Sequence, residues 1–352
     1  MRTFKLRNFS LTLAVLFLAL SSAAQIPYAY YTAVEGAKDA ALKTGLHQII
    51  RHHTQLEYYS SSTHFRTTDW HPDGYFWDMY SDVKKTSWSG LNREHCMPKS
   101  WWSTDPEYTI AYSDLHNLYP SNPAANTAKL NYPIGEVGTN VSFDNGVSKV
   151  GNNTFSGYTG TVFEPADEYK GDFARTYMYM VTCYEDYSNE WRSVGTESML
   201  NRNTYPVFRP YAVNLLLKWH RNDPVSDKEL NRNDAVYSIQ KNRNPFIDYP
   251  ILAEYLWGNK KGNAWDSSEA GNNVQEVFYI NFNRPNRELM VKLTPASGAP
   301  YQVHAMDGRT LITGELTSAT STNVPLDELG VGSYLITVQT PHNSYARIFL
   351  VF

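Results

Sequence analysis

The change in composition near Gly258 constrains the fold of this chain more than any other feature of its sequence. Residues 258–276 are rich in Gly, Asn and Ser, which is typical of a linker. Beyond it, residues 277–352 alternate β-prone runs with turns at a spacing that suits a small β-sandwich. Residues 25–257 instead contain several segments with helical periodicity. We therefore expect an α+β chain, with a mixed helical domain followed by a small all-β sandwich domain.

The first 24 residues have the pattern of a secretory signal peptide. Arg2, Lys5 and Arg7 form a basic segment, and the apolar run from Leu11 to Leu20 is too short to span a bilayer comfortably. Small residues then precede Gln25, where we expect cleavage. The alternative is a membrane anchor. We predict that the mature protein is exported and has no membrane span.

Charge and cysteine content limit the function less strongly. The chain has 352 residues and a formal net charge of −4, so no overall positive field indicates a nucleic-acid partner. A local basic groove is still compatible with that total. Cys96 and Cys183 are the two cysteines of the sequence. Export permits a disulfide between them, and two free buried thiols are an equal alternative.

Local patterns predict several elements of the larger domain. Periodicity, turn residues and capping signals give the following expectations: a helix over Ala37–Ile50, a hairpin around Asp73-Gly74, a helix capped by Asp172, a helix over Pro210–His220, and a capping box at Ser226–Glu229. The pair His52-His53 ends the first helix, where cations suit the helix dipole, so we do not interpret it as a metal site.

One segment places a carboxylate directly beside an imidazole. Glu94 precedes His95, and Pro98 follows three residues after the histidine. Neighbouring side chains on a regular strand point to opposite faces, so both can serve one site only if the strand ends here. Pro98 is compatible with such an ending.

A second segment supplies a partner strand and a helix. Asp114–Leu118 alternates polar and apolar residues as a paired strand would, and we expect His116 to be a structural histidine. Asn122-Pro123 then fits the N-cap and first residue of a helix. Asn126 lies about one turn inside that helix. A hairpin followed by a crossing helix would bring Asn126 beside Glu94.

These three residue types suit phosphodiester hydrolysis. A neutral imidazole accepts a proton from water near physiological pH, so His95 is the candidate general base. One Mg²⁺ can stabilise both the phosphoryl oxygen and the leaving group, and it prefers oxygen ligands. Glu94 and Asn126 offer a carboxylate and an amide oxygen. The pattern therefore predicts a metal-dependent nuclease.

Several separate stretches resemble the secreted endonuclease I family of ββα-metal, or His-Me finger, nucleases. They occur in the family's order between Tyr30 and Trp257. The stretches are NREHCMPKSWW (92–102), SDLHNLYP (113–120), NYPIGEVG (131–138), TVFEPADEYKGDFARTYMYM (161–180), WDMYSD (77–82) and NRNPFIDYP (242–250). The resemblance implies a ββα-metal finger core within the mixed helical domain.

The resemblance also implies roles for individual residues. It places the general base on His95 and the ligands of one Mg²⁺ on Glu94 and Asn126, with Mn²⁺ or Ca²⁺ as substitutes. It implies a catalytic arginine that contacts the phosphate, and Arg175 matches it. The residues expected to bind substrate are Arg93 and Lys129. The alternatives are a solvated basic residue for Lys129 and a helix salt bridge for Arg175.

The expected activity is that of a secreted endonuclease acting on DNA, with RNA as a further candidate, and leaving 5′-phosphates. Residues 279–352 resemble the sorting domain of type IX secretion, which implies that machinery as a partner and a route through the periplasm to the outer surface or beyond. We expect a monomer. The alternatives are a non-enzymatic surface protein that binds through aromatic residues, and a phosphoesterase acting on small nucleotides.

Overall fold

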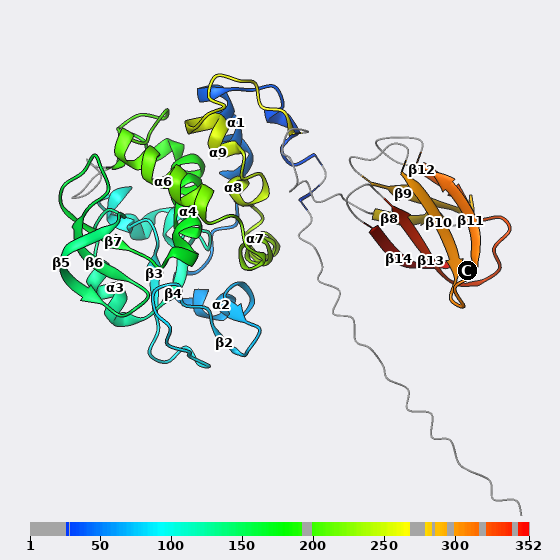
Figure 1. The fold of residues 1–352 in the computed structure, drawn as a ribbon, viewed down its shortest axis with the longest axis horizontal. Helices are drawn as coiled ribbons and strands as arrows, with labels where there is room; N and C mark the ends of the chain where they lie inside the picture. Colours follow the sequence, from blue (N-terminus) through cyan, green and yellow to red (C-terminus); the bar gives the residue numbers. More distant parts are fainter. Residues whose placement is uncertain are drawn as a thin grey trace, which may run out of the picture.

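The computed structural model describes residues 26–27, 29–191, 199–267, 279–283, 286–293, 299–316, 322–339 and 344–351. These residues form a larger body that mixes helices with small sheets and a smaller body made of strands (Figure 1). The expected α+β fold class is confirmed. The expected signal peptide lies outside the described residues, as do residues 268–276 of the expected linker.

Helices build most of the larger body. Their bounds are α1 Asp39–Ile50, α2 Ser61–Thr68, α3 Pro123–Lys129, α4 Lys170–Cys183, α6 Pro210–Asn222, α7 Asp227–Gln240, α8 Pro245–Asp248 and α9 Leu252–Trp257. The helices expected from periodicity are confirmed as α1, α4 and α6. The capping box at the start of α7 is also confirmed, because Ser226 and Glu229 each accept a hydrogen bond from the other's backbone N–H. Among the described residues, no helix is long and apolar enough to cross a bilayer.

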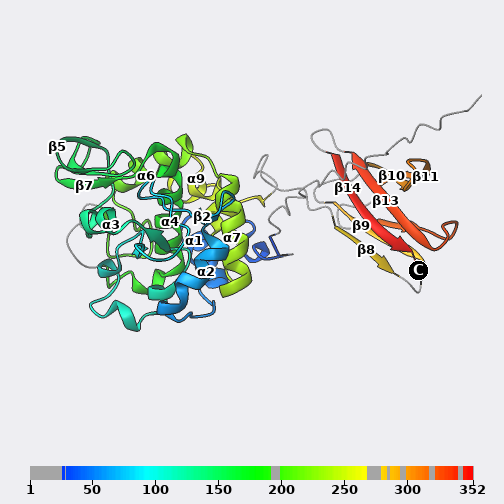
Figure 2. The same cartoon turned by 90° about the horizontal axis from the view of Figure 1, so that it is seen from below.

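Helix α4 is the centre of the larger body. Every residue from Gly171 to Cys183 is buried, and the helix packs mainly against α6 and α1. Figures 1 and 2 show it surrounded by the other helices. The expectation that Asp172 caps this helix is wrong. The helix begins earlier, at Lys170, and the buried Asp172 carboxylate instead forms an ion pair with Lys228.

Three small antiparallel sheets complete the larger body. They are β1 (Trp70–His71) with β2 (Tyr75–Phe76), β3 (Asn92–His95) with β4 (Leu118–Ser121), and β5 (Val137–Asp144) with β6 (Lys149–Asn153) and β7 (Thr161–Glu164). The hairpin expected around Asp73-Gly74 is confirmed, since Trp70 pairs with Phe76. The expected strand over Asp114–Leu118 is displaced, because pairing starts at Leu118 and Asp114 turns inward to bind side chains of α4.

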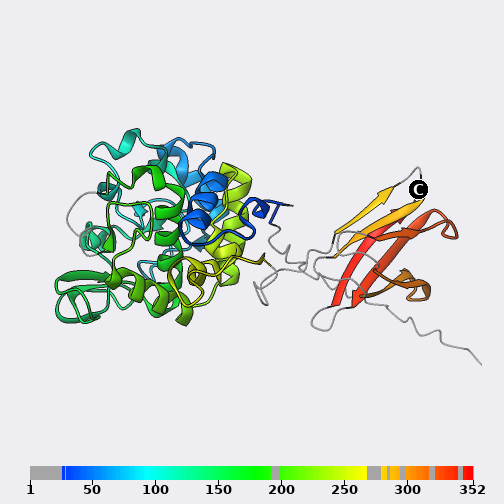
Figure 3. The same cartoon turned by 90° about the horizontal axis from the view of Figure 1, so that it is seen from above.

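The smaller body consists of two antiparallel sheets around a core of its own. One sheet has the strand order β11-β10-β13-β14, and the other has the order β12-β9-β8. The bounds are β8 Tyr279–Asn283, β9 Glu288–Lys292, β10 Pro300–Ala305, β11 Thr310–Glu315, β12 Thr322–Pro325, β13 Gly332–Gln339 and β14 Ser344–Val351. Val303 and Ile336 of one sheet meet Val324 and Leu289 of the other in the core. The expected all-β sandwich is therefore confirmed, and Figure 3 shows it beside the larger body.

Candidate active site

Strands β3 and β4 and helix α3 form a compact hairpin–helix unit. In the hairpin, Glu94 pairs with Tyr119 and His95 pairs with Leu118. A single residue, Asn122, joins β4 to α3, and its side chain accepts hydrogen bonds from the first free N–H groups of the helix. The expected cap is therefore confirmed. Because the connection is so short, α3 packs directly against β3.

Glu94 and Lys129 form a buried ion pair where α3 meets β3. Lys129 Nζ donates to Glu94 Oε1 at 2.7 Å and to the His95 carbonyl at 3.1 Å. The lysine is fully buried, and Glu94 is 8% exposed. Burial raises the pKa of Glu94, and the positive charge of Lys129 opposes this rise. The interpretation of Lys129 as a solvated residue is wrong, because its ammonium group lies inside the protein against a carboxylate.

Asn126 lies on the same face of α3 as Lys129, three residues earlier. Its Nδ2 donates to the Arg93 carbonyl at 3.4 Å, so the amide lies beside the strand residue that precedes Glu94. No hydrogen bond within the described residues uses Asn126 Oδ1 or the second oxygen of Glu94. These two oxygens are hard donors of the kind that Mg²⁺ prefers.

His95 is enclosed by aromatic rings. Its ring centroid lies 5.2 Å from that of Tyr112, 5.7 Å from Trp102 and 6.0 Å from Tyr58. Nε2 lies 2.8 Å from the Tyr112 carbonyl. A carbonyl only accepts, so Nε2 carries the proton and Nδ1 keeps its lone pair. Burial lowers the pKa of His95 to about 4, which leaves the imidazole neutral at physiological pH.

Arg93 lies next to the site, but its guanidinium already binds other groups of the protein. Its guanidinium donates to Ser61 Oγ at 2.7 Å and to the Tyr59 carbonyl at 2.5 Å. It also lies over the rings of Tyr58 and Trp88, at 5.4 and 5.2 Å. Arg93 therefore ties Tyr59 and the start of α2 to strand β3, and the neighbouring Tyr58 is one of the rings around His95.

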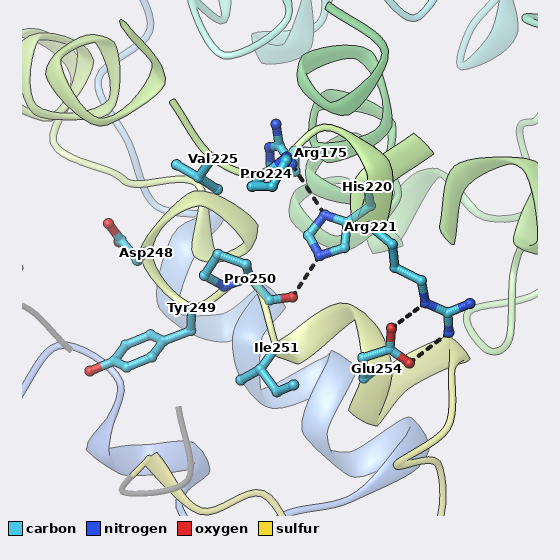
Figure 4. Close-up of a pocket in the computed structure, with 10 residues that line it drawn as sticks. All are labelled: Arg175, His220, Arg221, Pro224, Val225, Asp248, Tyr249, Pro250, Ile251 and Glu254. Atoms are coloured by element: carbon cyan, nitrogen blue, oxygen red, sulfur yellow. Dashed lines mark hydrogen bonds and ion pairs between the residues drawn. The ribbon is translucent and has the colours of Figure 1, made fainter. Parts of the chain in front are cut away.

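Arg175 lies in a different part of the body. Its fully buried guanidinium binds Glu229 through two bonds of 2.5 and 2.8 Å. It lines a cavity of about 260 Å³ together with His220, Arg221 and Glu254 (Figure 4). Neither Glu94 nor His95 lines this cavity. The structure thus places Asn126 beside the strand that ends with Glu94 and His95, and it holds Arg175 in a salt bridge between α4 and α7.

A second carboxylate and histidine lie close together elsewhere in the body. One ligand atom from each of His53, Asp114 and Cys183 lies within 4.8 Å of the others. Asp114 Oδ2 already accepts hydrogen bonds from the hydroxyls of Tyr179 and Tyr184, both at 2.6 Å. The Tyr184 hydroxyl also contacts His53 Nε2 at 2.9 Å. Because that hydroxyl bridges the histidine and the carboxylate, we interpret this group as a hydrogen-bond network.

The two cysteines are buried free thiols in the structure, which decides between the two alternatives drawn from the sequence. Cys96 follows the Glu94–His95 pair, and Cys183 ends α4. Burial strongly raises the pKa of Cys183 and also raises that of Cys96. Both side chains therefore act as small apolar groups of the core.

Sequence reasoning missed two residues that surround His95. Tyr112 supplies the carbonyl that fixes the imidazole, and its separation of 17 positions from His95 leaves no local signal of this contact. Lys99 has its Nζ 5.1 Å from the centroid of the Tyr112 ring. For Lys99 a signal was present, because the lysine follows His95 by four residues in the same motif.

The hairpin–helix unit holds a carboxylate, a neutral histidine and an amide, which are residue types that suit hydrolysis. The family comparison shows a nuclease. A family model described as Endonuclease I matches residues 39–251. The chain belongs to the endonuclease I family.

Curated relatives extend this match. An extracellular ribonuclease of Bacillus amyloliquefaciens is 34% identical over 257 residues, which are 69% of this chain and 84% of the relative. An extracellular ribonuclease of Bacillus subtilis (strain 168) is 32% identical over 66% of this chain and 80% of its own. Endonuclease-1 of Buchnera aphidicola subsp. Acyrthosiphon pisum is 26% identical over 47% of this chain and 53% of its own.

Among solved structures, a biofilm-associated protein BSP domain aligns with 26% of this chain and 17% of its own length. The identity is 17% and the TM-score is 0.20. A similarity this low supports no statement about fold or function.

Proposed function

We propose that this protein is a secreted, Mg²⁺-dependent endonuclease that hydrolyses DNA, with RNA as a second substrate, and shows little sequence preference. One observation supports the proposal: Glu94 and His95 end strand β3, and Asn126 of helix α3 bonds the carbonyl of the strand residue before Glu94. The family supports the reaction class. Relatives named ribonuclease and endonuclease support nucleic acid as the substrate and leave the choice between DNA and RNA to experiment.

In this proposal His95 is the general base. The Tyr112 carbonyl holds the proton on Nε2, so Nδ1 is the atom that accepts a proton from water. The surrounding rings fix the plane of the imidazole, and burial keeps it neutral. A neutral, fixed imidazole is in the protonation state that a base requires before each turnover.

Glu94 and Asn126 are the proposed holders of one Mg²⁺. The donor set fits this ion, because a carboxylate oxygen and an amide oxygen without hydrogen bonds to described residues lie at the same junction of β3 and α3. When bound, Mg²⁺ would neutralise charge on the phosphate and on the leaving oxygen. Lys129 meanwhile opposes the rise in the pKa of Glu94 that burial causes, and it holds the carboxylate through its other oxygen.

The arginines of the sequence-based prediction take supporting positions in this proposal. Arg93 lies close enough to the site to approach a bound nucleic acid. Its main role in this proposal is to anchor the segment at Tyr59 and Ser61. Arg175 contacts the phosphate only if it leaves Glu229, so we assign it to the stability of α4 against α7. Cleavage that releases the 3′-oxygen would leave 5′-phosphates, as the resemblance implies.

We also propose that the protein is exported. The basic and apolar residues at the start of the sequence support a signal peptide, and the extracellular relatives support secretion. We propose that the small β-sandwich is the sorting domain that delivers the enzyme through type IX secretion to the outer surface or the medium. The mature enzyme is proposed to act as a monomer, with residues 25–257 as its catalytic domain.

The test is cleavage by the purified mature protein of supercoiled plasmid and of a structured RNA, each with Mg²⁺ and with EDTA. We expect nicking of at least one substrate in Mg²⁺ and none in EDTA. The absence of cleavage of both in Mg²⁺ would overturn the proposal. Hydrolysis confined to small nucleotide esters would instead indicate a phosphoesterase, and binding without any hydrolysis would indicate a surface binding protein.

A further inference from the structure

The cations predicted to meet the substrate are all occupied by protein groups. Lys129 and Arg175 are fully buried and each binds a carboxylate. The Arg93 guanidinium donates hydrogen bonds to Ser61, Ser62 and the Tyr59 carbonyl. A nuclease must still hold the phosphate next to its base. The site therefore needs another cation that solvent, and hence a nucleic acid, can reach.

Lys99 meets this requirement. It begins the short helix that follows Pro98, and 43% of its side chain is exposed. Its Nζ lies over the ring of Tyr112, which stacks on His95, and the Tyr112 carbonyl accepts a hydrogen bond from His95 Nε2. Lys99 and His95 are thus neighbours across one tyrosine.

The partner of Lys99 is easily replaced. Lys99 Nζ donates to Glu107 Oε1 at 2.9 Å, and 49% of the Glu107 side chain is exposed. An exposed pair of this kind contributes little to stability, because water solvates both charges when they separate. A phosphate oxygen can therefore replace the carboxylate at small cost, and it offers the ammonium an equally strong acceptor.

We propose that Lys99 binds a backbone phosphate of the nucleic acid beside the scissile bond, and that Glu107 holds this lysine until the substrate displaces it. This rests on the proposed nuclease function and adds the residue that positions the substrate. No base is read by such a contact, which agrees with low sequence preference. Glu107 acts as a competing anion, so its charge should weaken substrate binding.

The chain provides a matched control in Lys218. Its side chain is 45% exposed, it pairs with Glu136 at 2.6 Å, and its Nζ lies 5.3 Å from the ring centroid of Phe155. Both pairs join a lysine to a glutamate, and the two lysines are similarly exposed, although Glu136 is less exposed than Glu107. Only Lys99 lies beside a ring that contacts His95. Lys99→Met and Lys218→Met therefore remove equal charges from two similarly exposed lysines.

The experiment measures binding of a short fluorescein-labelled single-stranded DNA by anisotropy, in EDTA so that no cleavage occurs, over a series of salt concentrations. Lys99→Met should weaken binding about tenfold at low salt. It should also reduce the slope of log affinity against log salt by about 0.7, the value for one lost phosphate contact on a single strand. Lys99→Arg should restore both. Glu107→Gln should tighten binding about threefold, and Lys218→Met should match the wild type.

Cleavage by the wild type in Mg²⁺ separates this inference from the proposed function. If the wild type cleaves while Lys99→Met binds and cleaves like Lys218→Met, the role of Lys99 is rejected and the nuclease stands. If Lys99→Met binds DNA weakly and Lys99→Arg does not restore the binding, the lysine serves the fold and the inference fails. If the wild type neither binds nor cleaves nucleic acid, both proposals fall.

Discussion

Two regions of this protein place a buried carboxylate beside a histidine, and they differ in what satisfies the carboxylate. Asp114 lies near His53 and receives four hydrogen bonds, from the hydroxyls of Tyr179 and Tyr184, from Gln240, and from a backbone N–H. Glu94 lies beside His95 and receives one ammonium group, from Lys129.

The difference separates a structural carboxylate from a candidate site. Despite complete burial, the pKa of Asp114 is held below its usual value, because nearby histidines and donated hydrogen bonds stabilise the anion. Burial raises the pKa of Glu94, and within the described residues one of its oxygens accepts no hydrogen bond. A carboxylate with unused acceptor capacity beside a neutral imidazole can bind a ligand, whereas a fully bonded one cannot do so without breaking its network.

The sharpest way to break this comparison is to remove one histidine from each region in turn. His95→Ala should lose about 10²- to 10⁴-fold in turnover, the usual contribution of a general base, while its circular dichroism stays native. His116→Ala, in the Asp114 network, should lower stability but keep the turnover of each folded molecule. Single-turnover cleavage of plasmid measures both. Near-native cleavage by His95→Ala would remove His95 from the role of base.

Removal of the structural carboxylate should cost the most stability. Asp114→Ala leaves four buried donors without their acceptor, so the free energy of unfolding should fall by about 3–5 kcal/mol. Urea denaturation of the wild type and the variant measures the loss. A loss below about 1 kcal/mol, the size typical of a single neutral hydrogen bond, would show that this network does not hold the fold.

The Lys129 ion pair should respond to metal, whereas the Asp114 network should not. Lys129→Met leaves Glu94 buried without its cation, at a cost of about 3 kcal/mol in the absence of metal. Mg²⁺ should recover part of this loss, because it binds the folded state through the same carboxylate. Thermal melts of Lys129→Met and Asp114→Ala with Mg²⁺ and with EDTA compare the two regions. Equal responses to Mg²⁺ would contradict the distinction.

Acid should destabilise the fold through buried neutral histidines outside the proposed site. Burial lowers the pKa of His116 and of His220 from 6.5 to about 4. Between these values the unfolded chain binds protons that the folded chain does not, so stability falls as the pH drops from 6.5 towards 4. Each histidine contributes at most about 3 kcal/mol. In urea denaturation, His220→Gln should lose less stability on acidification than the wild type. An identical pH dependence would refute the contribution of His220.

The smallest effect should come from the β-sandwich. Deletion of residues 277–352 should leave plasmid cleavage unchanged, because the two bodies have separate hydrophobic cores. The same deletion should prevent delivery to the cell surface if this domain is the sorting signal. A folded but inactive truncated protein would place the boundary of the catalytic domain beyond residue 257.

Elements governed by neighbouring residues could be predicted from the sequence. The capping box of α7 and the Asn122 cap of α3 depend on contacts within three residues, and both are present as expected. The close approach of Asn126 to β3 followed from a short connection between a hairpin and a helix.

Contacts between distant residues could not be predicted in this way. Lys129 meets Glu94 from 35 residues away, and Arg175 meets Glu229 from 54 residues away. No local pattern tells a buried basic residue from a solvated one, since both sit equally well on a helix. Asp114 left its expected strand because hydroxyls 65 and 70 residues further along the chain bind it.

The most direct test of the central claim is the binding of Mn²⁺, a spectroscopic substitute for Mg²⁺, followed by loss of the electron paramagnetic resonance signal of the free ion. The account predicts that the wild type and Asp114→Asn bind the ion, whereas Glu94→Gln and Asn126→Ala bind it much more weakly. Circular dichroism confirms that each variant is folded. Undiminished binding by Glu94→Gln, or its loss in a folded Asp114→Asn, would contradict the assignment of the site to the Glu94–His95 region.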